Sequence, residues 1–137
     1  VLTTWLLDLS SSRQLGLAPT GHAGRGTSGP PSPGATNLVL QPGPLSAEEL
    51  IGEVSDGLYV TELMGMGVRL VTGDYSRSAA GFRIRDGKLA EPVADLTLAG
   101  NLKEVFASLT PANDLDMRGA TFVPTVRVEG LTIGGGE

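Results

Sequence analysis

The sequence of 137 residues is 40% hydrophobic, carries a formal net charge of −5 and contains no Cys. Its length suits a single domain, and its apolar runs are far shorter than the roughly 20 residues that a transmembrane helix needs. Its 10 Lys and Arg residues are scattered, whereas nucleic-acid-binding surfaces cluster such residues against phosphates. We therefore expect no membrane and no direct nucleic-acid partner.

Two features bear on the origin of the chain. The sequence starts without Met and inside an apolar run, so we expect residues 1–137 to be one domain of a longer chain. The absence of Cys leaves no disulfide or thiolate chemistry within these residues. This composition fits a reducing compartment, and we expect a cytoplasmic protein.

The first third of the chain predicts a strand, a short helix and a long loop. Residues 1–7 are apolar and β-branched, which favours a strand. A helix is expected from Ser10 or Ser11 to Leu15, with Gly16 in the position that ends it. Residues 16–34 are rich in Gly, Pro, Ser and Thr and have too few large apolar groups to offset the entropy of ordering, so we expect a long irregular loop.

The clearest local signal is a helix start at Ser46, after residues 37–40 return to strand character. Glu49 follows Ser46 at the spacing of a capping box, in which each side chain accepts a hydrogen bond from the backbone N–H of the other residue. An apolar stripe at helical spacing should then be buried. The stripe consists of Ala47, Leu50, Ile51 and Val54.

Residues 57–82 form the central stretch of the chain. Two apolar runs, 58–63 and 68–71, are separated by the sequence Gly-Met-Gly, which predicts a pair of antiparallel strands with glycine turns. A second interpretation is that polar residues collect at the strand ends and line a groove that binds a peptide or a partner. These residues are Glu62, Asp74, Tyr75 and Ser76.

The remaining sequence predicts strands and a second helix. Residues 82–85 alternate between apolar and polar, and Asp86 and Gly87 suit a type I′ turn into a strand at 88–89. Residues 96–98 form another strand, and Asn101 caps a helix that Pro111 closes. Its apolar stripe is Leu102, Val105, Phe106 and Leu109.

A strand through Val126 and Val128 should turn Arg127 and Glu129 towards solvent. Gly130 then permits a bulge, and residues 134–136 should form a frayed end. Many short strands with two or three short amphipathic helices, in no βαβ alternation, predict an α+β fold with a mostly antiparallel sheet.

No complete catalytic constellation is present in the sequence. A zinc site of a hydrolase needs three protein ligands and an open position, but this chain has one His, no Cys and no H-E-x-x-H pair. A Ser–His–Asp triad would have to use His22, but the sequence has no G-x-S-x-G motif for the nucleophile. The glycines around His22 lack the G-K-[ST] ending of a phosphate-binding loop. We expect no catalytic residue and no metal site here.

Four phrases, in this order, resemble one family. They are TGHAG from Thr20, GLYVTELMGMGV from Gly57, TGDYSRSAAGF from Thr72 and AGNLKEVF from Ala99. They are similar to the TldD/PmbA family, historically labelled modulator of DNA gyrase. The likeness covers nearly the whole chain and looks closest to the C-terminal domain of the PmbA branch, also called TldE.

The resemblance implies a bacterial cytoplasmic system for proteolysis. In it a TldD subunit holds zinc on an H-E-x-x-x-H helix and a Cys of its C-terminal domain, and a TldE subunit pairs with it. The complex processes unfolded peptides, which dock as strands in an enclosed cavity. Between Asn113 and Val128, where a TldD-like chain would place its Cys, this sequence has none.

We therefore expect a non-catalytic, TldE-like subunit of a metallopeptidase complex, with zinc in the TldD-like partner and no cofactor of its own. The fragment would supply partner-interface and substrate-groove surface, and it would pair with a TldD-like subunit or with itself. Two alternatives stay open. One is a binding or scaffold module without a proteolytic role, and the other is an independent hydrolase that uses His22 and Asp74.

His22 is the candidate residue with two contrasting interpretations. In the first interpretation, which we favour, its ring is structural and bonds to nearby backbone groups, because buried polar groups need partners. Alternatively, it lies at the mouth of the groove beside Asp74 and Ser76 and holds a peptide carbonyl or a partner carboxylate.

Overall fold

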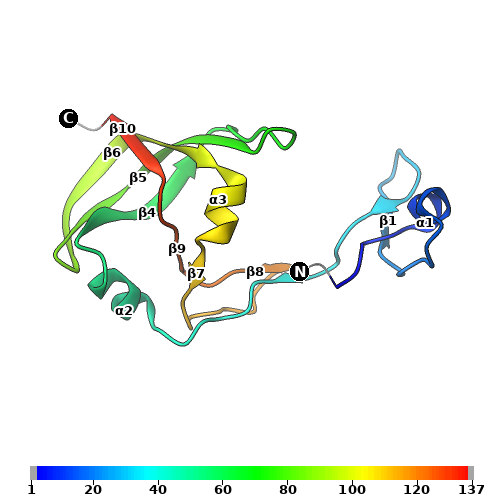
Figure 1. Ribbon diagram of the computed structural model, residues 1–137, viewed down its shortest axis with the longest axis horizontal. Helices are drawn as coiled ribbons and strands as arrows, with labels where there is room; N and C mark the ends of the chain where they lie inside the picture. The colour runs from blue at the N-terminus through cyan, green and yellow to red at the C-terminus, as the bar shows by residue number, and fades with distance from the viewer. Residues whose placement is uncertain (1–2, 136–137) are drawn as a thin grey trace. The chain divides into compact units, whose positions relative to one another are not determined.

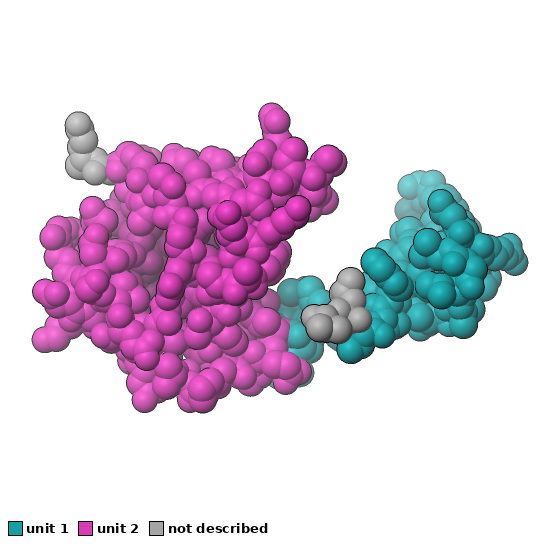
Figure 2. Space-filling view, in the orientation of Figure 1, with its two compact units in different colours: residues 1–39, 117–122 teal, residues 40–116, 123–137 magenta. Residues whose placement is uncertain are grey.

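The computed structural model describes residues 3–135, which divide into two compact units (Figures 1 and 2). The first unit comprises Val1–Val39 and Met117–Phe122, and the second comprises Leu40–Asp116 and Val123–Glu137. Within residues 3–135, no helix is long and apolar enough to cross a membrane.

The first unit contains helix α1 (Leu9–Leu15) and two short strand pairs. The carboxylate of Asp8 caps α1 by accepting the N–H of Ser11 at 2.7 Å, so the helix starts earlier than predicted. It ends at Gly16 as expected, with the left-handed φ of 66° that favours glycine. Strand β1 (Ala23–Gly24) pairs with β2 (Ser32–Pro33) inside the otherwise irregular loop, and β3 (Leu38–Val39) pairs in parallel with β8 (Thr121–Phe122).

The strand predicted over residues 1–7 is wrong for residues 3–7, which are irregular, and residues 1–2 lie outside the described chain. The Thr20 hydroxyl takes the place of a strand partner. It accepts the N–H of Leu7 at 2.8 Å and lies 3.1 Å from the carbonyl oxygen of Trp5. Apolar, β-branched residues form a strand only where a ladder partner is available, and here a side chain satisfies the backbone instead.

The second unit is built on an antiparallel sheet of four strands (Figure 1). Their order is β10 (Thr132–Gly135), β6 (Lys88–Asn101), β5 (Asp74–Arg85) and β4 (Asp56–Met64). The predicted Asp86-Gly87 turn joins β5 to β6 with the positive φ angles of a type I′ turn. Ala79, Leu96 and Leu98 are buried at the centre of this sheet.

The sheet differs from the prediction in the extent of its strands. Residues 88–89 and 96–98 belong to one strand of 14 residues, because β5 is long enough to pair along all of it through two register shifts. Residues 68–71 do not form a strand. Gly65 and Gly73 adopt positive φ, and the N–H of Ser76 bonds the carbonyl oxygen of Gly67 at 2.7 Å, so residues 65–73 close as a loop.

Two short helices border the sheet. Helix α2 (Ala47–Gly52) starts with the predicted capping box, since Ser46 and Glu49 each accept the backbone N–H of the other, at 3.1 and 2.7 Å. Only Leu50 of its stripe is buried, and Val54 lies beyond its end. Helix α3 (Leu102–Ala107) is capped by Asn101 as predicted, but none of its residues is buried.

The C-terminal segment returns along the second unit. Strand β9 (Val126–Arg127) pairs with β7 (Thr110–Pro111), and the chain then enters β10 after Gly130, which has the positive φ expected at a bulge. Gly134 and Gly135 are paired in the sheet rather than frayed, because β6 offers them a free edge. Gly136 lies outside the described residues. The architecture is the predicted α+β fold with a mostly antiparallel sheet.

Candidate functional site

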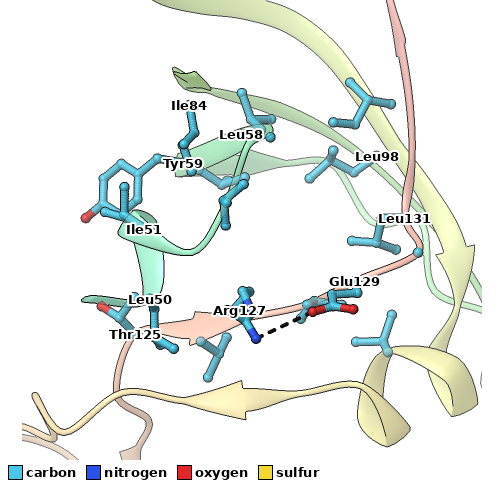
Figure 3. Close-up of a pocket in the computed structure, with 18 of the residues that line it drawn as sticks. Leu50, Ile51, Leu58, Tyr59, Ile84, Leu98, Thr125, Arg127, Glu129 and Leu131 are labelled. Carbon is cyan, nitrogen blue, oxygen red and sulfur yellow. Dashed lines mark ion pairs between the residues drawn. The ribbon is translucent and has the colours of Figure 1, made fainter. Parts of the chain in front are cut away.

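The second unit contains a groove of about 890 Å³ between the sheet and the segments that border it. Helix α2 lines one part of the groove, α3 another, and residues 124–131 form the wall opposite the sheet. Figure 3 shows Leu58, Ile84 and Leu98 on the sheet, with Leu131 near Leu98, where the chain returns towards the sheet. Most of the lining side chains are aliphatic or aromatic, so the groove suits apolar groups.

The helices form the sides of the groove because their apolar stripes point inwards without packing tightly. Leu50 and Ile51 of α2 line the groove, and so do Leu102 and Val105 of α3. Phe106 of α3 also borders it, although 72% of its surface is exposed. The predicted stripes are therefore present in part, since Val54 and Leu109 lie beyond the ends of the two helices. The side chains within the helices face an open groove instead of a filled core.

One basic side chain lies on the groove wall. The guanidinium of Arg127 pairs with Glu53 through Nη1 and with Glu129 through Nη2, which lies 3.5 Å from the carboxylate oxygen (Figure 3). Its side chain is only 24% exposed, and its Nε is buried without a hydrogen-bond partner among residues 3–135. The prediction that Arg127 faces solvent is therefore wrong.

The physical reason is the shortness of β9. Alternation along a strand determines which residues share a face, but β9 has two residues and a single neighbour. Residues 124–131 line the groove continuously instead of alternating. Glu53 precedes Arg127 by 74 positions, so no local sequence pattern predicted this ion pair.

The groove adjoins a sheet edge. Strand β4 has β5 as its single neighbour in the described sheet, so its other side carries unpaired backbone groups. Residues 57–60 and Leu63 of this strand line the groove. A register shift between Val60 and Glu62 interrupts the pairing with β5. A free edge next to an apolar groove is the arrangement that binds extended peptides in β-augmentation.

The residues predicted to form a groove are not brought together. Tyr75 is half-buried and lines the groove, whereas its neighbours Asp74 and Ser76 alternate outwards and are exposed. Asp74 accepts the hydroxyl of Thr72 at 2.7 Å, and Glu62 is exposed on β4. Strand alternation separates Tyr75 from the residues on either side of it.

His22 lies in the first unit, whereas the other four candidates lie in the second. Its Nδ1 is 3.0 Å from the hydroxyl oxygen of Thr20, the same hydroxyl that holds Leu7 and Trp5. The backbone carbonyl of His22 accepts the N–H of Gly34 at 3.1 Å, which closes the β1–β2 loop. The partner of the ring is thus a side chain, not the backbone group that we predicted.

Comparison with known proteins identifies the family. The model of the PmbA/TldA metallopeptidase C-terminal domain matches residues 1–135. The chain belongs to this family. Metalloprotease PmbA of Escherichia coli O157:H7 is 42% identical over 136 residues, which are 95% of this chain and 28% of that protein.

Two crystal structures have the same fold. A protein of Thermotoga maritima described as a modulator of a DNA gyrase is 35% identical with a TM-score of 0.83, and the match covers 98% of this chain and 31% of that one. TldE from Thermococcus kodakarensis is 25% identical with a TM-score of 0.81, over 93% and 30% of the two chains. The chain thus spans roughly a third or less of these PmbA/TldD relatives.

A metallopeptidase family implies a zinc ion, and the donor groups of this chain decide whether it could be held here. Catalytic zinc takes three protein ligands from His, Cys, Asp and Glu. In residues 3–135, no group of three such side chains is placed to hold a metal ion. His22 bonds Thr20, and the sequence has no Cys. The described residues of this PmbA/TldD domain do not fit a catalytic zinc site.

Proposed function

We propose that this domain belongs to a non-catalytic, TldE-like subunit of a cytoplasmic metallopeptidase complex, and that its groove holds an extended segment of an unfolded peptide. The observation that carries the proposal is the apolar groove beside the free edge of β4. Backbone hydrogen bonds to such an edge bind peptides with little dependence on sequence, and the groove receives every second side chain.

The donor groups support a non-catalytic role for this domain. The described residues do not fit a zinc site, so the peptide bond would be cleaved by a TldD-like partner that holds the metal. The domain would contribute binding and orientation of the peptide. Exposed apolar side chains outside the groove are candidates for the partner interface, namely Met66, Leu70 and Val71 of the loop at residues 65–73.

The test uses the full-length protein, a fluorescently labelled unfolded peptide and two variants of α3. Val105→Trp places a large side chain in the groove, and we expect it to weaken binding measured by fluorescence anisotropy by about tenfold, or 1.4 kcal/mol. Lys103→Trp is the matched control, because Lys103 is exposed on the same helix and does not line the groove.

The wild-type protein alone should bind the peptide without cleaving it, and cleavage should require the TldD-like subunit. Val105→Trp should then slow cleavage by the assembled complex as well. Peptide cleavage by the purified protein alone, or binding that is unaffected by Val105→Trp, would contradict the proposal.

A further inference from the structure

The charged side chains on the groove wall are unbalanced. Three of them are carboxylates, those of Glu53, Asp56 and Glu129, and among the described lining residues Arg127 is the only one with a basic side chain. The rest of the wall is mostly apolar. Such a groove favours an occupant that is apolar but cationic at one position, because a cation complements the excess negative charge of the wall.

Among the three carboxylates, that of Glu129 is the most available to bind another cation. Glu53 holds Nη1 of Arg127 directly, and Asp56 stands opposite Arg85 in the sheet. The carboxylate oxygen of Glu129 lies as far as 3.5 Å from Nη2 of Arg127, and 70% of the Glu129 side chain is exposed. The hydroxyl oxygen of Ser108, at the end of α3, lies 3.3 Å from the backbone carbonyl oxygen of Glu129. The carboxylate is therefore open to a second cation.

The surroundings of Glu129 determine what accompanies that cation. Figure 3 shows Glu129 next to Leu131, across the groove from Leu58 and Leu98. A peptide that lies along the edge of β4 turns every second side chain towards the groove. A cationic side chain of the peptide that pairs with Glu129 would therefore be followed, two positions along the peptide on the same face, by side chains that meet the apolar part of the groove.

We propose that the groove prefers extended peptide segments whose groove-facing side chains are apolar except for one Lys or Arg, which pairs with Glu129. This inference rests on the proposed function, because it names the class of peptide that the same groove takes. The apolar side chains supply burial, and the cation determines the register of the peptide along the groove.

The test compares three labelled peptides of equal length by fluorescence anisotropy, with the full-length protein alone at low ionic strength. The first alternates apolar residues with one Lys on the same face, the second has Glu in place of that Lys, and the third keeps the Lys but replaces the apolar residues by Ser. The first should bind most tightly. Glu129→Gln should weaken its binding by roughly two- to fivefold, the range of an exposed ion pair.

Glu91→Gln is the control, because Glu91 pairs with Arg85 at 2.6 Å and does not line the groove; it should change no affinity. Equal binding of the first two peptides, or equal weakening of both by Glu129→Gln, would overturn the preference and leave the proposed function standing. Binding by none of the three would overturn both. A dimer in sedimentation that Leu70→Ser dissociates, with peptides binding only after dissociation, would show that a second copy occupies the groove and would also overturn the proposal.

Discussion

Arg127 shares its guanidinium between two carboxylates on an apolar wall. A guanidinium on such a wall is partly desolvated, so its net contribution to the free energy of unfolding depends on how well its partners replace the hydrogen bonds of water. The pair with Glu53 does so directly, whereas Nε has no acceptor. Arg127 therefore positions residues 124–131 against α2 at an energetic cost that a fully exposed ion pair would not carry.

We expect Arg127→Met to lower the free energy of unfolding by about 1–2 kcal/mol, between the values of exposed and buried pairs. The reason is that Glu53 and Glu129 would lose their cation while the wall keeps its packing. Chemical denaturation of the full-length protein measures the effect. Arg85→Met is the control, because its ion pair with Glu91 is exposed; it should lower the free energy of unfolding by less than Arg127→Met does. Equal costs for both variants would show that the groove wall does not depend on this ion pair.

Thr20 links the N-terminal segment to His22. Its hydroxyl accepts the N–H of the buried Leu7, and the His22 ring bonds the same oxygen. We expect Thr20→Val to cost about 1–3 kcal/mol, because a buried N–H loses its acceptor, and His22→Ala to cost about 1 kcal/mol, because one hydrogen bond is lost. Faster hydrogen exchange of the Leu7 amide in Thr20→Val would report this directly. A stable His22→Ala variant that fails to form the complex would show that His22 is functional instead.

At the scale of the element, the start of α2 depends on one carboxylate. The hydrogen bond from the backbone N–H of Ser46, followed by that with its hydroxyl, lowers the pKa of Glu49 below its ordinary value of 4.5. A carboxyl whose pKa is lower in the folded state than in the unfolded chain contributes stability above the unfolded value. That contribution is lost as the pH falls through the lowered value.

Glu49→Gln should therefore be less stable than the wild type at pH 7, and the difference should disappear in acid well below the ordinary pKa of 4.5, where both side chains are neutral. Thermal unfolding of the two proteins at several pH values measures it. A difference that stays constant across this range would show that the charge of Glu49 does not matter to the helix.

The pairing of β4 with β5 depends on a close backbone approach at Gly81. A Cβ at this position would lie 1.9 Å from the carbonyl oxygen of Tyr59, so the strands would have to separate. We expect Gly81→Ala to cost about 1–3 kcal/mol or more in unfolding free energy. Gly134→Ala in β10 is the control, because a Cβ there meets nothing within 4 Å. A Gly81→Ala protein as stable as this control would contradict the close approach of the two strands.

At the scale of the whole molecule, the described chain buries little. None of its large side chains is fully buried, and Met66, Leu70 and Val71 are almost entirely exposed. Metalloprotease PmbA, of which this chain covers 28%, is more than three times longer. We infer that the second unit gains stability from surfaces outside the described residues.

Limited proteolysis tests how order is distributed over the molecule. Residues 16–34 are almost all exposed, and their only strands are the two-residue β1 and β2. We expect trypsin to cut first after Arg25, between these strands, because exposed loops with few contacts open easily. Cleavage after Arg85 or Lys88, which pair in the sheet, should be slower. A first cut at the Arg85–Lys88 turn that spares Arg25 would contradict the prediction.

Features that depend on a few neighbouring residues were predictable from the sequence. The Ser46 capping box, the Asn101 cap, the Gly16 helix end and the Asp86-Gly87 turn all formed as expected. Each is governed by backbone geometry and hydrogen bonds within about four positions. The motifs that carry the family resemblance were likewise recognisable as short sequence segments, and the family was confirmed.

Features that join distant residues were decided only by the tertiary structure. Residues 3–7 lost their predicted strand because Thr20 satisfied their backbone, and β6 grew to 14 residues because β5 could pair along it. The groove and its Arg127–Glu53 pair join segments 74 positions apart. Residue patterns encode which side chains share a face, but burial and partners depend on which surfaces meet. For this reason the sequence alone determined the helix caps and the turn at Asp86-Gly87, and the fold determined the lengths of the elements and the site.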